Sequence, residues 1–100
     1  MNDGADGFAR ELGRVVDRLR GMPVTRLAAS AALAFEASKR LLSMAIAAGD
    51  PVSGDLPRIG DHAAGDQLAV IGHDFASLQP SAAAYVEATE LLVELRRSLP

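Results

Sequence analysis

Two amphipathic repeats, one near each end of the chain, constrain the fold more than any other feature of the sequence. In both, apolar residues recur at alternating intervals of three and four, which places them on one side of an α-helix. The N-terminal repeat is Phe8, Leu12, Val15, Leu19 and Met22, and the C-terminal repeat is Tyr85, Ala88, Leu92, Leu95 and Leu99. Because such stripes must be buried against other helices, the sequence predicts a small all-α bundle.

An alanine-rich segment, residues 27–48, lies between the two repeats and is apolar around most of its circumference. We expect it to be the helix that both terminal helices cover. A loop of about a dozen residues, 49–60, contains three Gly and two Pro and precedes a weaker third helix. The prediction is a single domain, residues 1–100, folded as a small four-helix bundle with a long loop between helices 2 and 3, a frayed lead-in at 1–6 and helices at about 7–22, 26–48, 63–78 and 82–99.

Capping residues and helix breakers set the predicted helix ends. Asp6 is the expected N-cap of the first helix and Thr25 that of the second. Gly49 is the expected left-handed C-cap of the second helix. The third helix contains Gly65 and Gly72, each of which weakens it by about 1 kcal/mol relative to alanine. Gly72 alternatively permits a close contact between helices.

The composition narrows the classes of function. The 100-residue chain has no Cys, which excludes disulfides, thiolate zinc sites and a cysteine nucleophile. Its net charge of −3 argues against a nucleic-acid partner. Glu36, Lys39 and Arg40 interrupt the most apolar segment, so we expect no membrane span and no membrane partner. Residues 1–7 lack the regions of a signal peptide, and nine of the ten basic residues are Arg beside abundant Ala, so we expect a cytoplasmic, bacterial protein.

One polar constellation indicates chemistry. His62, Asp66 and His73 recur at helical spacing, and two imidazoles with a carboxylate can hold a divalent metal. Against this, His62 is expected before the start of the third helix, and the sequence offers no fourth ligand. The alternative is a loop histidine followed by a surface carboxylate and a second histidine near the middle of a helix.

The sequence Gly72-His73-Asp74, with Ser77 one turn later, invites a hydrolytic interpretation. Adjacent residues point in different directions on a helix, however, so Asp74 is poorly placed to orient His73. Nothing in the sequence supplies an oxyanion hole. We therefore predict no catalytic residue and no cofactor.

Two charged rows occupy the terminal helices. Arg10, Arg14 and Arg18 form a basic row in the first helix, and Glu87, Glu90 and Glu94 form an acidic row in the last. Each row lies mostly away from the apolar stripe of its own helix. The rows can pair within the bundle or between two copies of the chain, or can form two solvated faces, since exposed ion pairs contribute only about 0–1 kcal/mol.

Two sets of residues are candidates for a contact between copies. Small residues such as Ala28 and Ala32 recur at four-residue spacing and let a neighbouring helix approach closely, either in a second copy or within the same chain. The C-terminal heptad-like stripe offers Leu92, Leu95 and Leu99. Exposed apolar residues around the connections form a further candidate contact surface: Met22, Val24, Val52, Leu56 and Ile59.

No family resemblance is claimed. Ser77-Leu78 lacks the preceding Asp of the acyl carrier protein motif, and the chain has no Trp for the Trp-x-Gly bend of the small secreted helical hairpins. The predicted function is a non-enzymatic helical protein-interaction or regulatory module that self-associates as a homodimer and binds a further protein. The alternative is a bundle that binds a small ligand or a metal, with or without enzymatic activity, at a site around residues 49–60 and the third helix.

Overall fold

The structure, a computed structural model, describes residues 4–49 and 55–100, which form four α-helices and no strand. A single 3₁₀ turn, η1 (Asp61–Ala63), precedes the third helix. The helices are α1 (Ala5–Arg20), α2 (Val24–Ala47), α3 (Ala64–Ser77) and α4 (Ala82–Ser98). The all-α four-helix bundle predicted from the sequence is confirmed, and each helix end lies within about two residues of its predicted position.

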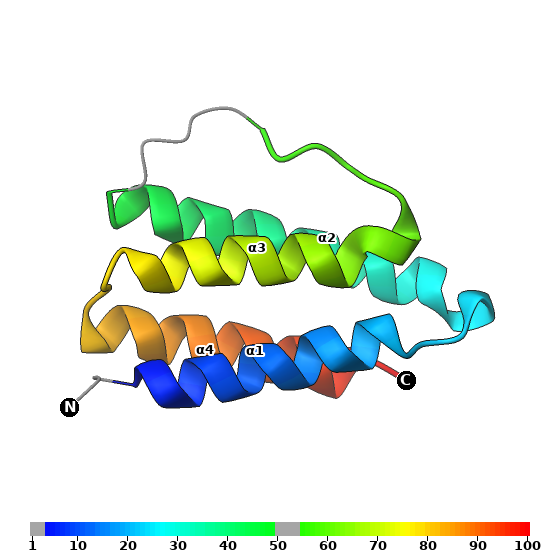
Figure 1. The fold of residues 1–100 in the computed structure, drawn as a ribbon, viewed down its shortest axis with the longest axis horizontal. Helices are drawn as coiled ribbons and strands as arrows, with labels where there is room; N and C mark the ends of the chain where they lie inside the picture. The colour runs from blue at the N-terminus through cyan, green and yellow to red at the C-terminus, as the bar shows by residue number, and fades with distance from the viewer. Residues whose placement is uncertain (1–3, 50–54) are drawn as a thin grey trace.

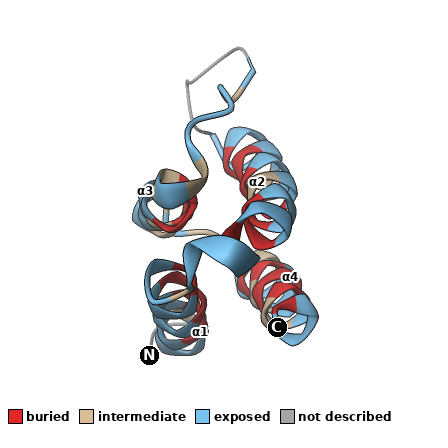
Figure 2. Ribbon diagram, turned by 90° about the vertical axis from the view of Figure 1, so that its right-hand side faces the viewer, coloured by how far each residue is buried: buried red, intermediate tan, exposed pale blue. Residues whose placement is uncertain are grey.

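The four helices form a square in which α1 and α4 run in one direction and α2 and α3 in the other (Figures 1 and 2). Each helix packs against two neighbours, so that α1 and α2 both contact α3 and α4. α1 and α2 lie on the diagonal and have few contacts with each other. The expectation that both terminal helices cover residues 27–48 is therefore wrong for the first helix, which packs on α3 instead.

Glycines in α3 explain why α1 packs there. A Cβ atom at Gly72 would lie 2.5 Å from Leu12 Cδ2, and one at Gly65 would lie 3.3 Å from Leu19 Cβ. Only a glycine lets the two backbones approach this closely without displacing those leucines. The glycines that weaken α3 as an isolated helix thus create its contact with α1, as the alternative interpretation of Gly72 predicted.

The core lies on the inward sides of all four helices (Figure 2). Both apolar stripes are buried there except for Met22, which is half-buried. At one end of the bundle, the rings of Phe8, Phe75 and Tyr85 form a cluster with centroid separations of 5.4–5.9 Å. Elsewhere the core consists of leucine and alanine together with Val15, Val16 and Ile71.

The two predicted N-caps are wrong, because each helix starts earlier than expected. Asp6 lies inside the first turn of α1, and Gly4 occupies the N-cap position with a φ of 96°. Thr25 lies inside the first turn of α2, because Pro23 takes the N-cap position in an extended conformation. The part of the predicted lead-in that the structure describes, from Gly4 on, is the N-cap and first turn of α1.

The C-terminal end of α2 and the N-terminal end of α4 show the interactions that stabilise them. Gly49 follows α2 with a φ of 115°, as predicted for a left-handed C-terminal residue. Ser81 caps α4, because its Oγ accepts a hydrogen bond from the Ala84 amide at 3.1 Å. The chain therefore turns sharply between α3 and α4 and keeps them antiparallel.

Candidate functional site

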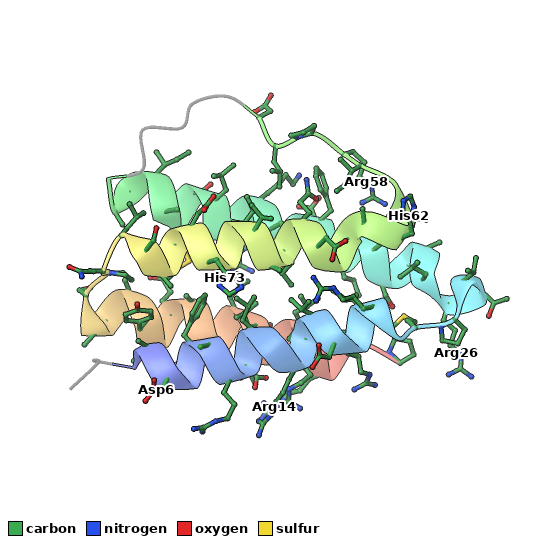
Figure 3. The ribbon with its side chains drawn as sticks, viewed as in Figure 1. Asp6, Arg14, Arg26, Arg58, His62 and His73 are labelled. Carbon is green, nitrogen blue, oxygen red and sulfur yellow. The ribbon has the colours of Figure 1, made fainter. Side chains whose placement is uncertain are left out.

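The predicted metal ligands lie at separate places on the surface. His62 is exposed in η1, and His73 is exposed more than two turns into α3 (Figure 3). Asp66 bonds Arg20 instead, with 2.8 Å from Nε and 2.6 Å from Nη2 to the carboxylate Oδ1. Within residues 4–49 and 55–100, no three His, Asp or Glu side chains come together as a metal-binding set. The structure thus uses Asp66 to tie α3 to α1.

The hydroxyl of Ser77 is engaged with the backbone. Its Oγ donates a hydrogen bond to the Asp74 carbonyl at 2.7 Å, one turn earlier in α3. His73 and Asp74 are both exposed to solvent. The structure therefore brings together no nucleophile and base from these three residues.

The C-terminal stripe belongs to the core of the single chain. Leu92, Leu95 and Leu99 are only 0%, 6% and 7% exposed, because α1 and α2 both pack against α4. The prediction that these leucines form a contact between copies is corrected on this ground. Ala28 and Ala32 lie exposed on α2 and remain accessible to a partner.

The apolar residues around the connections divide into two groups. Met22 and Leu56 are half-buried and pack against the core. Val24 and Ile59 are exposed, at 84% and 38%. Val52 lies outside the described residues. The predicted contact surface therefore retains Val24 and Ile59 as its accessible members.

The segment before η1 is held on α2 by Phe35. The Lys39 ammonium and the Arg58 guanidinium each lie 5.2 Å from the centre of the Phe35 ring. Arg58 also donates to the Ala31 carbonyl at 3.4 Å and pairs with Asp61 at 3.1 Å. A hollow of about 450 Å³ beside Phe35 is open to solvent and is lined by apolar and polar side chains alike: Leu42, Ile46 and Leu56 together with Lys39, Ser43 and Asp55.

The charged rows do not pair with each other within the chain. In the basic row, Arg14 contacts Glu11 at 3.5 Å, and Arg18 donates to the carbonyls of Leu99 and Pro100. Arg10 is exposed, and Figure 3 shows Arg14 pointing away from the bundle. Although α1 and α4 are neighbours, the arginines of this row bond within their own helix or to the chain end.

The acidic row is fully on the surface. Glu87, Glu90 and Glu94 are all exposed, and across the described parts of the chain none of them forms an ion pair. Pairing of the two rows within the bundle, one of the sequence alternatives, is therefore not observed. Two opposite rows remain exposed on adjacent, parallel helices.

A buried ion pair joins α1 and α4 and was missed by sequence reasoning. The Glu11 side chain is only 6% exposed, and its Oε1 accepts a hydrogen bond from Arg96 Nε at 2.5 Å. The sequence did carry a signal, because Glu11 stands three residues after Phe8 and four before Val15, at the edge of the apolar stripe. This pair fixes which sides of the two helices face each other.

Comparison with protein families, with curated proteins and with solved structures gave no match to this chain. Among the described helices, none is long and apolar enough to cross a membrane.

Proposed function

We propose that this protein is a non-enzymatic helical interaction module that self-associates as a homodimer. The observation that carries the proposal is the surface formed by α1 and α4. Arg10 and Arg14 of the basic row and Glu90 of the acidic row are exposed there, and none of them pairs between α1 and α4. The other two glutamates of the row, Glu87 and Glu94, line hollows against α2.

An apolar strip separates the two rows. Around α4, where each residue advances about 100°, Val86 and Val93 fall between the acidic row and the side that contacts α1. Val86 is 57% exposed and Val93 is partly exposed. A face with apolar side chains at its centre and charges at its edges has the composition of a protein interface. Exposed charges alone would favour two solvated faces, because exposed ion pairs contribute little. The apolar strip between them is what supports an interface.

A second exposed surface competes with this one. Ala28 and Ala32 lie on the outward side of α2, near Leu33, which is 43% exposed. These alanines remain the sequence-based candidates for close helix packing with a second copy or with another protein. Binding of a further protein, and a bacterial, cytoplasmic origin, also remain predictions from the sequence.

Sedimentation equilibrium of the full chain at low and at physiological ionic strength tests the proposal. We expect a species of twice the 10.4 kDa chain mass that dissociates as salt is raised. A chain that stays monomeric at every concentration and salt would contradict the proposal. If the dimer is lost in Ala32→Arg, self-association uses α2 instead of the α1–α4 face.

A further inference from the structure

α1 and α4 are parallel, and contacts at both ends define their register (Figure 1). Between these ends, Arg96 reaches Glu11, 85 residues earlier, through two long side chains. At one end, a Cβ atom on Gly4 would lie 3.2 Å from Tyr85 Cβ. At the other end, Arg18 Nη2 lies 3.5 Å from the Leu99 carbonyl oxygen. Both contacts join residues that are 81 apart in the sequence. A residue on α1 is therefore level with the residue about 81 positions later, on α4.

This register brings opposite charges to the same levels. Glu90 lies one residue from the level of Arg10. Glu94 lies one residue from the level of Arg14, but it lines a hollow against Arg40 of α2 and so faces away from α1. One residue of an α-helix is about 1.5 Å along its axis, well within the reach of these long side chains. Arg10 and Glu90 are therefore the pair of opposite charges that is both level and exposed at the α1–α4 face.

One further pair of opposite charges lies at a common level, and one pair of like charges does not follow this pattern. Asp17 on α1 and Arg97 on α4, both exposed, also lie within one residue of the same level, with the signs reversed. Glu87, by contrast, is level with Asp6, which has the same charge, and it lines a hollow against α2. Glu87 therefore lies outside the set of matched pairs.

Symmetry then selects one arrangement of two copies. A twofold axis parallel to the helices sets α1 of each copy against α4 of the other without a shift along the axis. A twofold axis across the helices sets α1 against α1 and α4 against α4, which opposes arginine to arginine and glutamate to glutamate. Only the first arrangement converts the level match into attraction, and it makes every pair twice.

We propose that a second copy of this chain docks on the α1–α4 face with its helices parallel to those of the first. Arg10 of each copy pairs with Glu90 of the other at the edge of the strip that contains Val86. This inference rests on the proposed self-association and specifies its face and direction. The alanines on the outward side of α2 stay uncovered in such a dimer and remain open to another protein.

The size of the face defines the kind of dimer. Helices of 16 and 17 residues are about 25 Å long, and two of them side by side are about 20 Å wide. Each copy therefore contributes about 500 Å², which is at the lower end for specific interfaces. The contact is weak and depends on ionic strength, because exposed pairs are screened within about 10 Å at 0.1 M salt.

A reciprocal charge exchange tests this arrangement. In Glu90→Arg, arginine faces arginine in both halves of the dimer, and in Arg10→Glu, glutamate faces glutamate. We expect each variant alone to dimerise on the order of tenfold or more weakly than the wild type at low salt. An equimolar mixture of the two restores the dimer, because the exchanged signs attract again. Glu87→Arg is the matched control: it makes the same charge change in the same row and keeps the dimer.

The outcomes separate the inference from the function on which it rests. Far-UV circular dichroism first establishes that each variant is as helical as the wild type. A wild-type dimer that withstands both Glu90→Arg and Arg10→Glu overturns the proposed face and leaves the proposed function in place. Loss of the dimer in both variants without recovery in the mixture also overturns the pairing. A monomeric wild type overturns both proposals.

Discussion

Replacing Gly72 by alanine inserts a methyl group into the contact between α1 and α3. The new Cβ atom would lie 2.5 Å and 2.8 Å from the two methyl carbons of Leu12, whose side chain is only 3% exposed. Alanine improves the intrinsic stability of the helix by about 1 kcal/mol. Crowding a packed core costs about 1–3 kcal/mol. We therefore expect Gly72→Ala to lower the free energy of unfolding by about 0–2 kcal/mol.

The same substitution at Gly13 supplies a matched control. Gly13 lies in α1, where an added Cβ atom would meet nothing within 4 Å. Gly13→Ala then gains the helix propensity without the crowding and raises the free energy of unfolding by about 1 kcal/mol. The two variants should differ by about 1–3 kcal/mol, and that difference measures the helix contact alone.

Urea unfolding followed by far-UV circular dichroism measures this difference. The slope of the unfolding free energy against urea should be unchanged, so the midpoints report stability directly. Adding Leu12→Ala to Gly72→Ala makes room for the methyl group, so the two substitutions should cost less together than the sum of their separate effects. If Gly72→Ala stabilises the chain as much as Gly13→Ala does, the close packing of α1 on α3 is refuted.

Three further predictions concern the core. Ser38 is buried, and its hydroxyl has no hydrogen-bond partner among the described residues, so Ser38→Ala should raise the urea midpoint by the equivalent of about 1 kcal/mol. Arg96→Met leaves the buried Glu11 carboxylate without its closest partner and should lower the free energy of unfolding by about 2 kcal/mol, more than Glu11→Gln does. Equal losses for the two variants in the same unfolding assay would argue against the buried pair. Leu92→Asp buries an unpaired charge and should abolish the cooperative thermal transition; a folded monomer would show that Leu92 lies at a contact between copies.

Local periodicity predicted the helices because it reflects burial within a single helix. Phe8, Leu12, Val15 and Leu19 repeat at helical spacing, and all four are in the core. Gly49 ends a helix because glycine adopts a positive φ at low cost. Thr25 misled the prediction of a helix start because Pro23, two residues earlier, already has the backbone geometry of an N-cap.

Local patterns in the sequence could not predict which helices pack against each other. Gly72 signals either a weak helix or a close contact, and only its meeting with Leu12, sixty residues away in the chain, decides between them. The ligand hypothesis for His62, Asp66 and His73 depended partly on long-range placement in the same way, because Asp66 pairs with Arg20, 46 residues earlier in the chain. The charged rows were visible in the sequence, but their common levels follow from the parallel packing of α1 and α4.

A native mass spectrum of Glu90→Arg mixed with isotopically labelled Arg10→Glu tests self-association through the α1–α4 face most directly. The isotopic label gives the two homodimers and the heterodimer different masses. We predict that the mixed dimer dominates, near twice the 10.4 kDa chain mass, while each variant alone is mainly monomeric. A spectrum with only monomers, or with the three dimers in statistical proportion, would contradict the pairing of Arg10 with Glu90 across this face.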